Sequence, residues 1–164
     1  MLSHTAPIAV VNRTHAMPPD ARFAPPLDAG VNQRASQRIA DILKLLSTAL
    51  APQRRLVHAG EVVYQAGEPF ANLYILNSGF FKIVTMSPDG REQVVGLKFR
   101  GDWLGFDGIA HGSYSCDAVA MDTGEVWTIR YDALLAACAN QRELLTLLHE
   151  AMSREIVHDR DSLM

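Results

Sequence analysis

The chain has 164 residues, a formal net charge of −3 and a hydrophobic fraction of 48%, which is enough apolar material for one compact domain. The acidic balance is the wrong sign for a surface that follows nucleic-acid phosphates, so we do not expect this chain to bind duplex DNA. Two isolated cysteines, Cys116 and Cys138, disfavour a zinc knuckle and are typical of a reducing compartment. No apolar run approaches the length of a transmembrane helix, so we expect a cytoplasmic protein that makes no membrane contact.

The N-terminal region is rich in proline. Five of the eight prolines fall within the first 26 residues, where they remove backbone donors and block helix formation. Residues 1–35 are therefore predicted to form a mobile tail, with an ordered arm packed on a partner as the alternative. The first helix is predicted to begin at Ser36, which can serve as an N-cap, and to end before Pro52. Apolar residues recur there at helical spacing: Ile39, Ile42, Leu43, Leu46 and Leu50.

The middle of the chain reads as a series of short strands. Ten of the eleven glycines lie between Gly60 and Gly124, and they separate runs of aromatic and β-branched residues. Residues 87–90, Ser-Pro-Asp-Gly, predict a hairpin turn, because proline presets φ and glycine accepts a positive φ. Many short strands with regular glycine turns are typical of a sandwich, jelly roll or barrel. The predicted strands include residues 62–64, 73–76, 80–84, 93–95 and 126–129.

Two helices are predicted after the strands. A short helix covers residues 131–139, and a longer one runs from about Gln141 to the end of the chain. One side of the longer helix carries a stripe that would pack either on its own roll or on a partner helix. Because the stripe continues to the end of the chain and contains an aspartate, we favour a partner helix, with His149 and His158 on solvated faces. The stripe comprises Leu145, Leu148, Met152, Ile156, Asp159 and Leu163.

The order of these elements resembles the effector half of the Crp/Fnr-type bacterial transcription regulators. The resemblance covers about residues 37–164, and its last strings are more similar to the Fnr branch than to the Crp branch. It implies a mainly β fold with flanking helices over residues 36–139, a double-stranded β-helix (jelly roll), followed by a dimerisation helix over residues 140–164. The strings that carry it are residues 60–69, 73–82, 90–94, 101–109 and 152–156, the last followed by Asp159.

The chain departs from the members of this family that bind cyclic nucleotides. The resemblance implies that the segment after Gly101-Asp102 would supply a glutamate for the ribose and an Arg-Ser pair for the phosphate. Phe106 stands at the glutamate position here, and Cys116 and Asp117 stand at the Arg-Ser positions. Loss of the arginine contact removes roughly 1.5–3 kcal/mol of binding free energy, and Asp117 adds repulsion. We therefore expect a degenerate site that binds neither cAMP nor cGMP.

The chain also departs from the Fnr-type members that carry an iron–sulfur cluster. Those members use a group of cysteines in the N-terminal arm and one cysteine in the roll. The arm of this chain has no cysteine, and Trp127 stands where the roll cysteine is expected, so we expect no cluster and no other cofactor. A cupin-like enzyme would need several converging histidines, whereas the roll contains only His58 and His111; we therefore expect no enzymatic activity.

Two functions stay open at this point. The chain is either the sensor and homodimerisation module of a regulator, or a naturally short interaction protein that forms heterodimers with full-length regulators. In both cases DNA would be reached only through a helix-turn-helix domain, for which this chain has no segment. RNA polymerase is a candidate partner of the full regulator, and the signal is not readable from the sequence.

Overall fold

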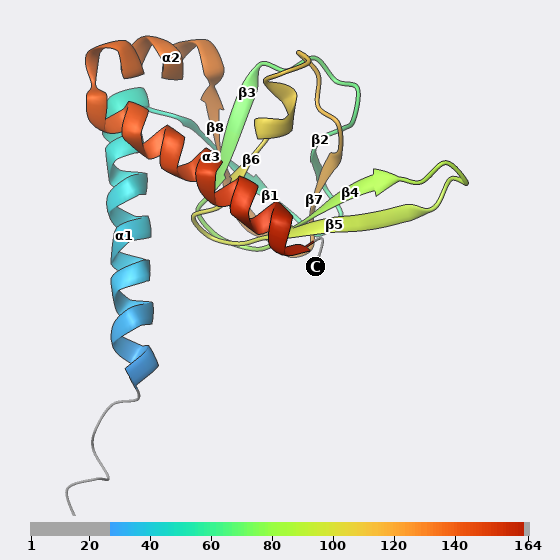
Figure 1. Ribbon diagram of the computed structural model, residues 1–164, viewed down its shortest axis with the longest axis horizontal. Helices are drawn as coiled ribbons and strands as arrows, with labels where there is room; N and C mark the ends of the chain where they lie inside the picture. The colour runs from blue at the N-terminus through green and yellow to red at the C-terminus, as the bar shows by residue number, and fades with distance from the viewer. Residues whose placement is uncertain (1–26, 163–164) are drawn as a thin grey trace, which may run out of the picture.

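The computed structural model describes residues 27–162, which form one helix, two antiparallel sheets and two further helices (Figure 1). The helices are α1 (Leu27–Leu50), α2 (Tyr131–Asn140) and α3 (Arg142–Ser162), with a short 3₁₀ helix η2 (Phe106–Gly108) between strands. The strands are β1 (Gln53–Val57), β2 (Val62–Tyr64), β3 (Asn72–Leu76), β4 (Phe81–Met86), β5 (Glu92–Lys98), β6 (Trp103–Leu104), β7 (Asp117–Ala120) and β8 (Gly124–Arg130).

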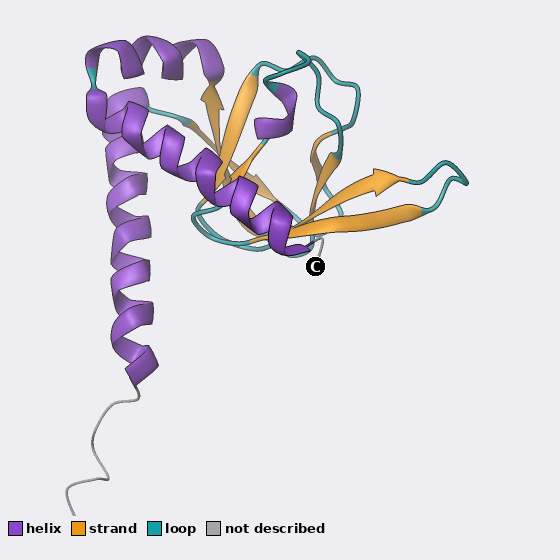
Figure 2. Ribbon diagram, viewed as in Figure 1, coloured by secondary structure: helices purple, strands orange, loops and turns teal. Residues whose placement is uncertain are grey.

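The eight strands form two four-stranded sheets with the orders β1-β8-β3-β6 and β2-β7-β4-β5. The two sheets pack face to face, because one buried cluster draws on both of them, for example on Tyr74 and Val126 from the first and on Phe81 and Ala118 from the second. β4 and β5 form the predicted hairpin, which projects from the roll (Figure 2). The predicted jelly roll is thus confirmed.

The outer face of the first sheet is covered by the helices. Strand residues alternate between the two faces: Tyr74 and Leu76 point into the roll, whereas Leu73 and Ile75 join a second cluster on the other side. In that second cluster the helices contribute Leu43 and Leu46 from α1, Leu134 and Cys138 from α2, and Leu144, Leu147, Leu148 and Ala151 from α3.

The first helix begins earlier than predicted. α1 starts at Leu27, directly after Pro25-Pro26, so residues 27–35 are helical and not part of a tail. The sequence prediction missed these turns because residues 29–35 are exposed, Val31 at 66%, and apolar periodicity begins only where the helix meets the roll. The rest of the predicted tail lies outside the described residues. None of the helices between residues 27 and 162 is long and apolar enough to cross a membrane.

Candidate functional site

A cavity of about 360 Å³ lies between the roll and α3. Figure 1 shows α3 crossing the roll, and the cavity is lined in part by the segment in which the sequence predicts a degenerate nucleotide site. On the roll side the main lining residues are Lys98, Trp103 and Phe106, and on α3 they are Met152, Glu155 and Ile156.

Phe106 opens the short helix η2 and forms part of the cavity wall. Gly105, which precedes it, has φ 104°, a conformation that glycine adopts without strain. The Phe106 ring stacks on Trp103, with 5.7 Å between the ring centroids and an interplanar angle of 19°. An aromatic pair therefore stands where a ribose-binding carboxylate is expected from the family resemblance.

Asp107 is the residue of this site that sequence reasoning missed. Its Oδ2 accepts hydrogen bonds from the backbone N–H of Ser115 at 2.7 Å and from the Ser115 hydroxyl at 2.8 Å. The thiol of Cys116 donates to the same oxygen at 3.4 Å. The carboxylate thus satisfies donors of the segment that would hold a phosphate. The available signal was an acidic residue in the first turn of a short helix, a common position that by itself indicates no partner.

Cys116 is buried, with 7% of its surface exposed. Burial, followed by the negative charge of Asp107, raises the pKa of the Cys116 thiol to about 12. Burial also raises the pKa of Tyr64, whose ring stacks on Tyr114 beside this thiol. A thiol with so high a pKa stays protonated near neutral pH and is a poor nucleophile.

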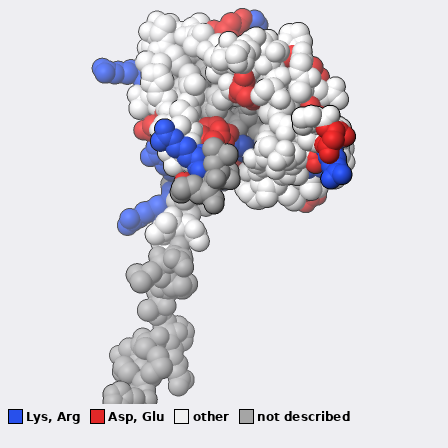
Figure 3. Space-filling view, turned by 45° about the vertical axis from the view of Figure 1, so that its right-hand side comes forward, with Lys and Arg blue, Asp and Glu red and all other residues white. Residues whose placement is uncertain are grey.

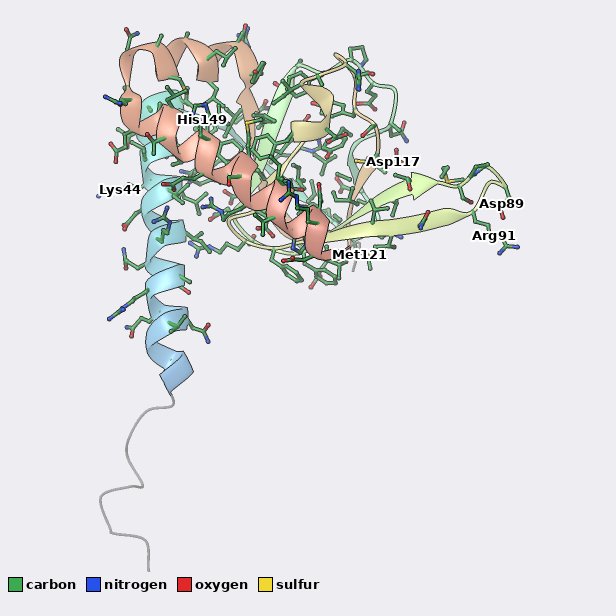
Figure 4. The ribbon with its side chains drawn as sticks, viewed as in Figure 1. Lys44, Asp89, Arg91, Asp117, Met121 and His149 are labelled. Carbon is green, nitrogen blue, oxygen red and sulfur yellow. The ribbon has the colours of Figure 1, made fainter. Side chains whose placement is uncertain are left out.

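Asp117 has a different role from the one that its position in the sequence indicates. Its Oδ1 accepts a hydrogen bond from the backbone N–H of Ala66 at 2.7 Å, which ties the start of β7 to the turn after β2 (Figure 4). The three predicted site positions are therefore not used alike: Phe106 and Cys116 line the cavity, whereas Asp117 holds a neighbouring turn.

The cavity contains a largely buried ion pair. Lys98, at the end of β5, is 6% exposed, and its Nζ lies 2.5 Å from Oε1 of Glu155 on α3. Asp107 and Asp159 supply two more carboxylates to the described lining of the cavity. Lys98 is the one lysine in that lining. A cavity with this balance offers little attraction to an anion.

The predicted stripe on α3 divides between two environments. Leu148 is 5% exposed and belongs to the core beneath the helix, against which Met152 also packs. Leu145 and Ile156 are 37% and 56% exposed, and Asp159 is exposed as well. Leu163 lies outside the described residues. Leu148 thus anchors α3 to its own roll and leaves almost no surface for a partner.

The remaining candidate ligands do not converge. Trp127 is 4% exposed, and the guanidinium of Arg54 lies 4.4 Å from the centre of its ring. His111 is exposed on a loop. Within residues 27–162, no three or more His, Cys, Asp or Glu side chains lie close enough together to hold a metal ion. The face shown in Figure 3 carries acidic and basic side chains interspersed with uncharged surface, and no patch of one sign dominates it.

Comparison with known proteins gives a consistent picture. A family model, the cyclic nucleotide-binding domain, matches residues 54–141. The chain is 30% identical over 112 residues to electron transport regulator A of Shewanella oneidensis, which covers 68% of this chain and 45% of the relative. The same values hold for the fumarate and nitrate reduction regulatory protein of Escherichia coli. The chain therefore spans less than half the length of these curated relatives.

Solved structures share the fold. The catabolite activator protein of Thermus thermophilus matches with a TM-score of 0.63 and 22% identity, over 74% of this chain and 56% of that one. The sensor domain of the regulator DNR from Pseudomonas aeruginosa matches with a TM-score of 0.59 and 21% identity, over 79% of this chain and 93% of that domain. At 21–22% identity, these two matches show only that the architecture is shared.

Proposed function

Because the chain belongs to the cyclic nucleotide-binding domain family, as the sensor domain of a Crp/Fnr-type regulator, we propose that it is a sensor and homodimerisation module that responds to neither cAMP nor cGMP. The observation that carries this proposal is the carboxylate of Asp107. It accepts from Ser115 and Cys116 in the segment that would otherwise face a phosphate.

The local chemistry supports the same conclusion at each contact. A phosphate that entered here would compete with Asp107 for the Ser115 N–H and would be repelled by its charge. Cys116 is a protonated thiol and offers only a weak donor. Phe106 has no group that can bind a ribose hydroxyl. No arginine lies in the described lining of the cavity to compensate for these losses.

Calorimetry with each nucleotide tests this proposal. We expect no stoichiometric heat when cAMP or cGMP is titrated into the chain at low micromolar concentrations. The variant Asp107→Asn, which removes the charge but keeps an oxygen acceptor, serves as the matched comparison. Stoichiometric binding to the unmodified chain would overturn the proposal, whereas weak binding to Asp107→Asn alone would support the role assigned to the carboxylate.

Homodimerisation is proposed from the outer face of α3. Leu145 and Ile156 are 37% and 56% exposed on the same side of this helix, and an apolar helix face gains free energy by burial against another helix. A two-fold pair would bury the same face on both copies.

We also propose that the module carries no iron–sulfur cluster. Trp127 is buried at the roll position that the family resemblance links to a cluster ligand, and its indole takes no part in thiolate ligation. An absorption spectrum of protein prepared without oxygen tests this proposal, and a visible band together with bound iron would contradict it.

A further inference from the structure

A second periodic pattern runs along α3 beside its core-facing side. Its members follow one another at alternating steps of four and three residues: Leu145, His149, Met152, Ile156 and Asp159. All are exposed except Met152, which is half-buried. Alternating steps of four and three residues are the 3.5-residue repeat of a seam between two helices. The stripe predicted from the sequence contained Leu148, whereas the seam contains His149 at that point of the repeat.

The seam is separate from the side of α3 that packs on the roll. The core-facing side chains are Leu144, Leu147, Leu148 and Ala151. With 3.6 residues per turn, the centre of the seam lies roughly 110° around the helix from the centre of this buried side. A helix can therefore pack on its roll and on a second helix at the same time.

The surface beside the seam favours a second copy of this chain as its occupant. Met152 and Ile156 share the cavity wall with Val95 of β5, whose side chain is 47% exposed. Apolar surface thus continues from the seam onto the roll, where a second helix would cover both. A two-fold contact is self-complementary, so each side chain of the seam would face its own copy or a near neighbour.

We propose that His149 makes the pairing of α3 with α3 of a second copy along this seam sensitive to pH. The dimer is tighter when the imidazoles are neutral and weaker when they are protonated. This inference rests on the homodimerisation proposed above and adds the residue that regulates it.

Few fixed charges surround His149 on its own helix. The residues three and four positions away on α3 are Leu145, Thr146, Met152 and Ser153, none of which is charged. The charged groups of the elements packed against α3 are mostly paired with one another. They are Arg38 with Glu150, Asp41 with the amide of Gln37, Arg130 with Asp132, Lys98 with Glu155, and the exposed Arg34 and Lys44 of α1.

The pH range follows from ordinary side-chain chemistry. An imidazole changes its charge between about pH 5 and pH 8, whereas carboxyl groups ordinarily do so near pH 4. Between pH 6 and pH 8, histidine is therefore the side-chain type whose charge we expect to change. Two protonated imidazoles facing each other across the seam repel, and we expect the dissociation constant to rise roughly tenfold from pH 8 to pH 6.

Sedimentation of the full chain at pH 8 and pH 6, at one ionic strength, measures this effect. The variant His149→Gln should still dimerise and should lose the difference between the two pH values. His158→Gln, which changes the other histidine of α3, should keep it. Persistence of the pH effect in His149→Gln, or its loss in His158→Gln, would overturn the inference.

A cysteine cross-link separates this inference from the proposed dimer itself. The variant His149→Cys should form a disulfide-linked dimer on oxidation, because the two positions meet across the seam. Arg154→Cys, on the opposite side of the same helix, should not. A dimer that His149→Cys fails to cross-link would overturn the seam but leave homodimerisation intact. A chain that stays monomeric at both pH values would refute both proposals.

Discussion

The two halves of α3 differ both in apolar content and in surroundings. In the first half, Leu144, Leu147 and Leu148 are at most 8% exposed and close the core over the first sheet. In the second half, Ile156 and Val157 are more than half exposed, and the ion pair of Lys98 with Glu155 joins this half to the roll. The comparison shows that the first half of one helix can complete the core of its own domain while the second half leaves its apolar side chains exposed.

The largest effect is expected in the buried half. Leu144→Ala removes a fully buried side chain, so the free energy of unfolding should fall by about 2–5 kcal/mol. Val157→Ala in the second half is the control, because this side chain is 54% exposed and lies off the seam, so its removal should cost under about 1 kcal/mol. Chemical denaturation of both variants at one protein concentration gives the two values. Equal losses would mean that the halves do not differ as described.

Ile156→Glu tests the exposed half. A charge on the seam should raise the dissociation constant of the dimer roughly a hundredfold or more, because the carboxylates would be buried without partners. The fold should be unaffected, since Ile156 is 56% exposed. Val157→Glu introduces the same charge at a side chain that is 54% exposed but lies off the seam, and it should dimerise nearly normally. If sedimentation finds Ile156→Glu as dimeric as the unmodified chain, the contact lies on another surface.

The ion pair predicts an asymmetry between its two partners. Glu155→Gln leaves the cation of Lys98 almost fully buried without a counter-charge, whereas Lys98→Met leaves a carboxylate that is 31% exposed and can reach water. We expect Glu155→Gln to cost about 1–3 kcal/mol, Lys98→Met less, and the double variant to recover part of the loss. Hydrogen exchange should rise in residues 153–162 and not in residues 142–152. Equal costs for the two single variants would argue against this account.

The smallest effect is expected at Asp159. In a two-fold dimer the two carboxylates approach each other, and their repulsion is reduced by solvent because Asp159 is exposed. Asp159→Ala should therefore tighten the dimer roughly tenfold at neutral pH. Sedimentation of the variant and the unmodified chain over a concentration series measures the difference. A dimer that weakens on Asp159→Ala would place this residue in an attractive contact instead.

The sequence by itself determined the class of fold and most of its elements. The hairpin at residues 87–90, the strands that end at Tyr64 and Leu76, and both C-terminal helices were all predictable. These features depend on local chemistry: the period of apolar residues, proline and glycine at turns, and β-branched runs. Several short sequence segments then identified the family resemblance. Each segment is weak evidence alone, but their order along the chain is that of the family.

Only the tertiary structure decided which side chains the site uses. Asp107 and Asp117 are both acidic residues near the predicted phosphate position, yet one binds Ser115 and Cys116 while the other holds the turn at Ala66. On α3, Leu148 and His149 are neighbours in the chain, and packing on the first sheet buries the former and exposes the latter. Helical periodicity fixes the angle between two side chains but not the direction of the sheet that covers one of them. That direction is set by contacts between residues far apart in the sequence, and it separates the anchoring side of α3 from the side left for a partner.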